Sequence, residues 1–145
     1  MIFNLCKRLC CFALILMLIS CGIQQKFELQ QAAKLGELSR DDFTNAMRWK
    51  QFDVAGSLML PEHRKHFMKT FMPLTKEIHI IDVRLTYLQS SEENHRFEMT
   101  VEMDYYLLPS VTIKTFSFDQ TWLYFDGEGS TPEGFFVTTP FPDFP

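Results

Sequence analysis

Two histidines lie three residues apart in the segment 62–69, a spacing that places both on one side of a helix. Two imidazoles at this spacing could hold a divalent metal ion if a third ligand came from elsewhere in the chain. His63 and His66 are flanked by Lys65 and Lys69, whose positive charges repel a cation. We therefore interpret this group as the solvated side of a helix and predict no metal site and no cofactor.

Three tyrosines and one aspartate are the candidates for proton transfer. An acid or base inside an apolar cavity has a pKa shifted towards neutrality, as such chemistry requires. The candidates are Tyr87, Tyr105, Tyr106 and Asp104; Asp104 alternates onto the polar face and should face water, whereas Tyr87 and Tyr105 fall on apolar faces. A core tyrosine with a satisfied hydroxyl is the commoner role for such positions. We predict no catalytic residue.

Aromatic side chains crowd the last thirty residues, and two interpretations stay open. They can form one large core with the proline-rich end of the chain packed over it. Alternatively, they line an apolar pocket or patch that holds a lipid-like ligand or a partner protein. Pro140, Pro142 and Pro145 keep this end of the chain extended. It can therefore fold back on its own domain or bind to a neighbouring molecule. The candidate pocket residues are Tyr87, Tyr105, Phe116, Phe118, Trp122 and Tyr124.

The first 20 residues have the pattern of a secretory signal peptide. Lys7 and Arg8 precede the uncharged apolar run 9–19, and no acidic residue is present. A helix needs roughly 20 apolar residues to cross a bilayer, so this run is too short to span one stably.

The sequence Leu18-Ile19-Ser20-Cys21-Gly22 then resembles the lipobox of bacterial lipoproteins. The resemblance implies that Cys21 receives a diacylglycerol thioether, that cleavage precedes it, and that its new amine is acylated, for example with palmitate. Gly22, rather than Asp, implies sorting to the outer membrane. Several acyl chains on one residue hold a soluble domain firmly at a membrane surface. The alternatives are an ordinary signal peptide, or a buried apolar helix with an incidental cysteine.

Charge and cysteine usage agree with an exported, lipid-anchored protein. The net charge is −4, and loss of two basic residues with the signal peptide would make it about −6. Such a chain lacks the net positive charge typical of nucleic-acid-binding proteins and the basic surface patch that binds anionic lipids. The four cysteines are Cys6, Cys10, Cys11 and Cys21, so only the lipid-bearing one would remain and no disulfide could form within the chain.

The remaining chain reads as helices followed by strands. Residues 21–38 are expected to be the lipidated cysteine and a tether, and residues 39–145 a single domain. Ser39 and Asp42 resemble a capping box that starts the first helix. Apolar residues then recur every three positions, at Phe43, Ala46, Trp49 and Phe52. Two further helices are expected, one capped by Asp53 and one that starts at Pro61 and ends at Pro73.

From residue 77 the apolar period changes to two, which indicates strands. The first has Ile81, Val83, Leu85 and Tyr87 on its apolar face. The clearest is 96–107, in which every second side chain is apolar, and strands over 111–125 and 135–139 follow. Helices segregated from an antiparallel meander of about four strands predict an α+β domain.

This arrangement resembles the nuclear-transport-factor-2-like, cystatin-like cone, in which helices pack on a curved antiparallel sheet. The resemblance rests on residues 49–52, on Pro61-Glu62-His63-Arg64 and on residues 120–124, and it extends to small proteobacterial lipoproteins. Together with the lipobox, the aromatic excess and the missing catalytic constellation, it leads us to predict an outer-membrane lipoprotein with a non-catalytic periplasmic binding or assembly module for an apolar ligand or partner. The alternatives are a small acid–base enzyme of the same fold and an accessory subunit of a cell-envelope machine.

Overall fold

Helices precede strands in the structure, a computed structural model that describes residues 31, 33–91 and 95–145. Within these residues the first helix covers 33–48 and is followed by α2 (Phe52–Ser57) and α3 (Pro61–Leu74). The strands are β1 (Ile78–Ser91), β2 (Arg96–Leu107), β3 (Lys114–Asp126) and β4 (Glu133–Val137). They form one antiparallel sheet in the order β1-β2-β3-β4. The predicted α+β class is confirmed.

The first helix starts earlier than its sequence suggests. It already includes Ser39 and Asp42, so the expected capping box at that point is wrong. The early turn approaches the sheet at Gly36, where a Cβ atom would lie 3.2 Å from the ring of Phe97. Glycine therefore permits a close contact between helix and sheet. A pattern of apolar side chains does not predict this contact, because glycine has no side chain.

The apolar stripe of this helix is confirmed at Phe43 and Ala46, which are buried, but not at Trp49, which is 72% exposed. Trp49 lies in the turn after the helix, where Lys50 adopts a positive φ of 57°. The Lys50 Nζ donates hydrogen bonds to the carbonyls of Thr75 and Ile78. The turn is thus tied to the end of α3 and the start of β1.

The helix α3 begins at Pro61 as predicted, with the proline at its first position. Its apolar side is confirmed at Phe67 and Phe71, both fully buried, whereas Met72 is half exposed. Arg64 reaches back to α2, and its guanidinium donates to the carbonyls of Gly56, Ser57 and Met59. These bonds pair the Ser57 and Met59 carbonyls at and beyond the end of the short helix and add to the bond that the Gly56 carbonyl accepts from the N–H of Met59.

The predicted alternation of β2 is confirmed along the strand. Its inward side chains are buried, and they alternate with side chains that are at least partly exposed. We call the face that packs on the helices the inner face; from β2 it carries Phe97, Met99, Val101, Met103 and Tyr105.

The expected apolar face of β1 is wrong at two positions. Val83 is buried and Leu85 packs against the core, but Ile81 and Tyr87 are about half exposed. The pairing with β2 shifts register between Ile80 and Asp82 and again between Leu85 and Tyr87. Each shift turns the following side chains to the other face, which strict alternation does not anticipate.

The strand β3 begins at Lys114, later than the predicted start at residue 111. Val111 and Ile113 lie instead in an exposed loop before it. Its inner face is confirmed at Phe118 and Trp122. The short strand β4 starts two residues earlier than predicted and ends at Val137.

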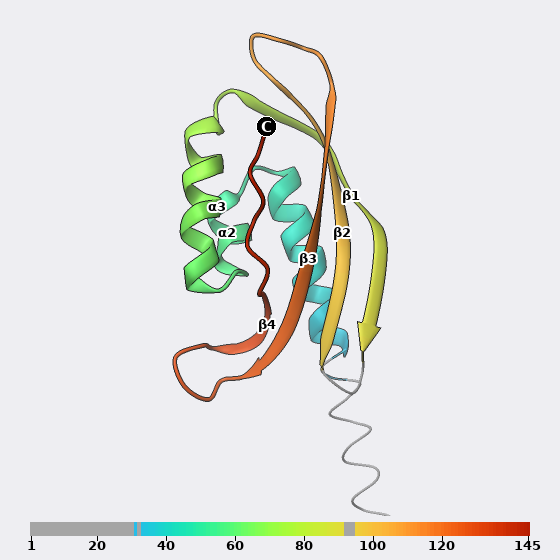
Figure 1. Cartoon of the computed structure of the whole chain (residues 1–145), viewed down its shortest axis with the longest axis vertical. Coiled ribbons are helices and arrows are strands. Elements are labelled where there is room, and N and C mark those ends of the chain that lie inside the picture. The colour runs from blue at the N-terminus through green and yellow to red at the C-terminus, as the bar shows by residue number, and fades with distance from the viewer. Residues whose placement is uncertain (1–30, 32, 92–94) are drawn as a thin grey trace, which may run out of the picture.

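The helices cover the inner face of the sheet, and none of the described segments covers the other face (Figure 1). After β4 the chain continues as residues 138–145, called the closing segment below. It runs between α3 and β3 (Figure 1), with Phe141 buried in the common core.

Candidate functional site

Aromatic rings fill the space between α3, the inner face of the sheet and the closing segment. Phe141 contacts Phe67 and Phe118 with ring centroids 5.1 and 4.9 Å apart. Phe144 contacts Phe71 and Tyr105 at 5.1 and 4.8 Å. We call this group the aromatic cluster; its members are Phe67, Phe71, Tyr105, Phe116, Phe118, Phe141 and Phe144.

The closing segment is fixed to the sheet by hydrogen bonds at its start and by side chains beyond. The N–H of Thr138 donates to the Thr121 carbonyl over 2.8 Å, and the N–H of Thr121 donates to Thr139 Oγ1 over 2.9 Å. Within the described chain, residues 140–145 make no further hydrogen bond. Asp143 lies 3.6 Å from the Nε2 of His66, an exposed contact that is an ion pair only when the histidine is protonated.

The candidate pocket residues fall into two groups and one outlier. Tyr105, Phe116 and Phe118 belong to the aromatic cluster. Trp122 stacks on Phe97 at 5.4 Å and meets Phe43 edge-on, and Tyr124 contacts Phe135, so these two lie farther along the same face of β3. Tyr87 is separate: it lies on the edge strand β1, half exposed, and its hydroxyl donates to Gln89.

Two polar groups lie among the buried rings. Burial raises the pKa of Tyr105, so its hydroxyl is protonated at neutral pH and available as a hydrogen-bond donor. Gln120 is 3% exposed, and its Oε1 accepts a hydrogen bond from the Trp122 indole over 3.2 Å. Its Nε2 has no partner within the described part of the chain. The sequence analysis did not identify Gln120 as a buried polar residue. It could have done so, because Gln120 shares the inward face of its strand with Phe118 and Trp122.

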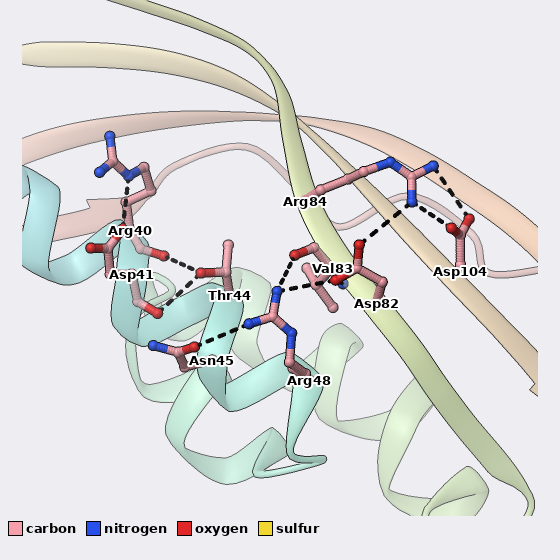
Figure 2. A network of polar contacts seen from close by, with 9 residues as sticks. All are labelled: Arg40, Asp41, Thr44, Asn45, Arg48, Asp82, Val83, Arg84 and Asp104. Atoms are coloured by element: carbon pink, nitrogen blue, oxygen red, sulfur yellow. Dashed lines mark hydrogen bonds and ion pairs between the residues drawn. The ribbon is translucent and has the colours of Figure 1, made fainter.

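The outer face of the sheet carries an ion-pair network around Arg84 (Figure 2). Its guanidinium bonds Asp104 and lies 2.9 Å from a carboxylate oxygen of Glu102. Hydrogen bonds from Arg84, then from Thr115, hold the pKa of Asp104 below its usual range. Asp104 therefore faces outward as predicted and is ionised at neutral pH, which suits a structural carboxylate better than a general acid.

A second arginine joins the first helix to the edge of the sheet (Figure 2). Arg48 donates to the carbonyl of Val83 over 2.7 Å and to Asp82 over 3.2 Å. The Val83 carbonyl lies on the edge strand, so Arg48 occupies an acceptor that a neighbouring strand would otherwise use.

His66 and His79 lie outside the aromatic cluster, and the ring centroid of His95 lies 5.9 Å from that of Tyr124. His66 is exposed on α3, and His79 stacks on Tyr106 with centroids 4.8 Å apart on the outer face. Within the described residues no group of three or more His, Cys, Asp or Glu side chains could hold a metal ion.

The proposed lipid-attachment residue Cys21 and the signal peptide 1–20 lie outside the described residues. No helix in the described part of the chain is long and apolar enough to cross a membrane. Comparisons with protein-family models, curated proteins and solved structures found no match to this chain.

Proposed function

We propose that the protein is an outer-membrane lipoprotein, anchored through Cys21, whose periplasmic domain is a non-catalytic module that binds an apolar ligand or partner. The anchor is supported by the basic start, the short apolar run and the sequence Leu18-Ile19-Ser20-Cys21-Gly22. The net negative charge fits an attachment made by lipid rather than by a basic surface.

The binding proposal rests on how weakly residues 140–145 are held over the aromatic cluster. One of its walls, residues 140–145, is held by Phe141 and Phe144 and by no main-chain hydrogen bond within the described chain. Apart from the exposed contact of Asp143 with His66, this wall is held by apolar contacts, and another apolar group that makes equivalent contacts can displace it. Displacement would uncover Phe67, Phe71 and Phe118, which are large and apolar enough to hold a ligand.

The chemical character of the interior favours binding over catalysis. Its polar groups in the described structure are a neutral tyrosine hydroxyl and the amide of Gln120. Both can orient a ligand by hydrogen bonding, but neither exchanges a proton readily near neutral pH. We propose further that the curved sheet with its helical cover belongs to the nuclear-transport-factor-2-like architecture.

An apolar fluorescent probe, N-phenyl-1-naphthylamine, tests the binding proposal on the mature chain with Cys21→Ser. We expect weak binding by this chain and at least tenfold tighter binding after Phe141→Ala, which loosens the closing segment. Val111→Ala removes an exposed apolar side chain in the 108–113 loop and is the matched control. Circular dichroism verifies that each variant is folded. Equal binding by all three folded proteins would refute an apolar site beneath the closing segment.

A further inference from the structure

The strand β3 is longer than its partner β4, and this leaves part of one edge without a pairing strand. The strand β4 pairs only with residues 122–126 of β3, whereas β3 begins at Lys114. Residues 114–121 therefore pair with a strand only on the side of β2, and within the described chain the closing segment bonds their other side only at Thr121.

The main-chain groups of alternate residues point to that free edge. The Thr121 carbonyl and N–H both bond the closing segment, so Thr121 points away from β2. Since the direction alternates along a strand, Asp119 and Ser117 point the same way. Neither makes a main-chain hydrogen bond to residues 140–145 in the described structure.

The prolines of the closing segment explain why the pairing stops. In the register of β3 and β4, Trp122 lies opposite Val137. Continuing that register places Pro140 opposite Asp119 and Pro142 opposite Ser117. Proline has no N–H to donate, so both positions that would bond the free edge are blocked.

The continued register fits the place of one aromatic side chain but not of the other. It would put Phe144 opposite Thr115 on the outer face, whereas the Phe144 ring contacts Phe71 and Tyr105 on the inner side. Phe141, between the two prolines, lies opposite Phe118, and their ring centroids are 4.9 Å apart. Phe141 thus fills the side-chain site that an added strand would use, but residues 140–145 leave the main-chain donors and acceptors of Ser117 and Asp119 unused within the described structure.

We propose that the edge of β3 at Ser117 and Asp119 is a docking site for an extended segment of a partner protein. The partner residues opposite Ser117 and Asp119 are not proline, and a large apolar residue lies between them. It displaces residues 140–145, takes the site of Phe141 and adds main-chain hydrogen bonds that the closing segment cannot make. This inference rests on the proposed binding function and names the class of partner.

Two synthetic peptides test the inference, one with the sequence of residues 137–145 and one with alanine in place of the prolines at 140 and 142. The protein is the mature chain with Cys21→Ser and Phe141→Ala, and the readout is amide hydrogen exchange by NMR. We expect the alanine peptide to slow exchange at Ser117 and Asp119 at least tenfold, with little effect from the proline peptide. The amides of Phe118 and Gln120 point towards β2 and serve as internal controls.

A second variant tests the same edge within one chain and needs no peptide. Pro140→Ala with Pro142→Ala should let the closing segment pair with β3, so exchange at Ser117 and Asp119 slows. Pro145→Ala is the matched control and should change neither amide.

Unchanged exchange in both experiments would overturn the inference, and the prolines would then serve only to protect the edge. Protection that depends on the concentration of the unsubstituted chain would instead identify a second copy as the occupant and overturn the partner assignment. If the naphthylamine probe binds but the alanine peptide does not, the strand-docking inference fails while the apolar site stands.

Discussion

Replacing Phe141 with alanine tests how firmly the closing segment is held. Removing a fully buried phenylalanine ring costs about 3–5 kcal/mol when the surrounding chain stays in place. Phe141 is only 5% exposed, but its segment has few other attachments. If the ring is lost the segment can detach, and the cost is then limited to the free energy of docking.

That docking free energy can be worked out approximately from the contacts. Burial of the Phe141 ring stabilises docking by about 2–3 kcal/mol, and burial of the partly buried Phe144 ring by about 1–2 kcal/mol. Ordering the three residues of 140–145 that are not proline opposes it by about 1–2 kcal/mol each. The two contributions nearly cancel, so the expected loss for Phe141→Ala is at most about 2 kcal/mol, compared with about 3–5 kcal/mol for Phe67→Ala in α3.

Urea denaturation of the mature chain with Cys21→Ser, followed by far-ultraviolet circular dichroism, measures these losses. The double substitution Phe141→Ala with Phe144→Ala provides a sharper test. Once the segment has detached, the second substitution should add less than about 0.5 kcal/mol. A loss for Phe141→Ala as large as that for Phe67→Ala, or additive losses in the double variant, would refute the reasoning.

Three other substitutions test separate parts of the description. Cys21→Ser should move the protein from the membrane to the soluble fraction or leave its signal peptide uncleaved; normal processing with membrane retention would exclude lipidation. Arg84 lowers the pKa of Asp104 in the folded state, so this carboxylate stabilises the fold above about pH 4, and that contribution is lost as the pH falls through the folded-state value. Asp104→Asn should therefore make urea midpoints less sensitive to acid, and an unchanged acid dependence would contradict this. Gly36→Leu should cost about 1–3 kcal/mol in thermal denaturation because its side chain meets Phe97, whereas a negligible loss would mean that this helical turn does not pack on the sheet.

The parts of the fold that follow a regular period could be predicted from the sequence. The alternation in β2 identifies its buried face because one side packs on the helices and the other faces water. Pro61 marks the start of α3 because proline suits a first helical position.

The errors arise where a contact depends on backbone geometry or on distant residues. Gly36 packs on the sheet without a side chain, so the apolar pattern places the helix start too late. Two register shifts turn Ile81 and Tyr87 outward, and neither leaves a signal in the composition of β1.

The sequence predicted that an aromatic cluster exists, but not which elements enclose it. The excess of aromatic residues near the end of the chain indicates a large apolar cluster, and Phe116, Phe118 and Tyr105 do belong to it. Whether the proline-rich end closes over the cluster depends on contacts with α3, seventy or more residues earlier in the chain.

The order of the sheet has a consequence for how the protein folds. Each strand pairs with its neighbour in sequence, so most of the sheet forms from contacts over short loops, which favours rapid folding. The contact between Phe67 and Phe141 closes a far longer loop. Docking of the closing segment should therefore follow the rate-limiting step, and Phe141→Ala should accelerate unfolding while leaving the folding rate nearly unchanged.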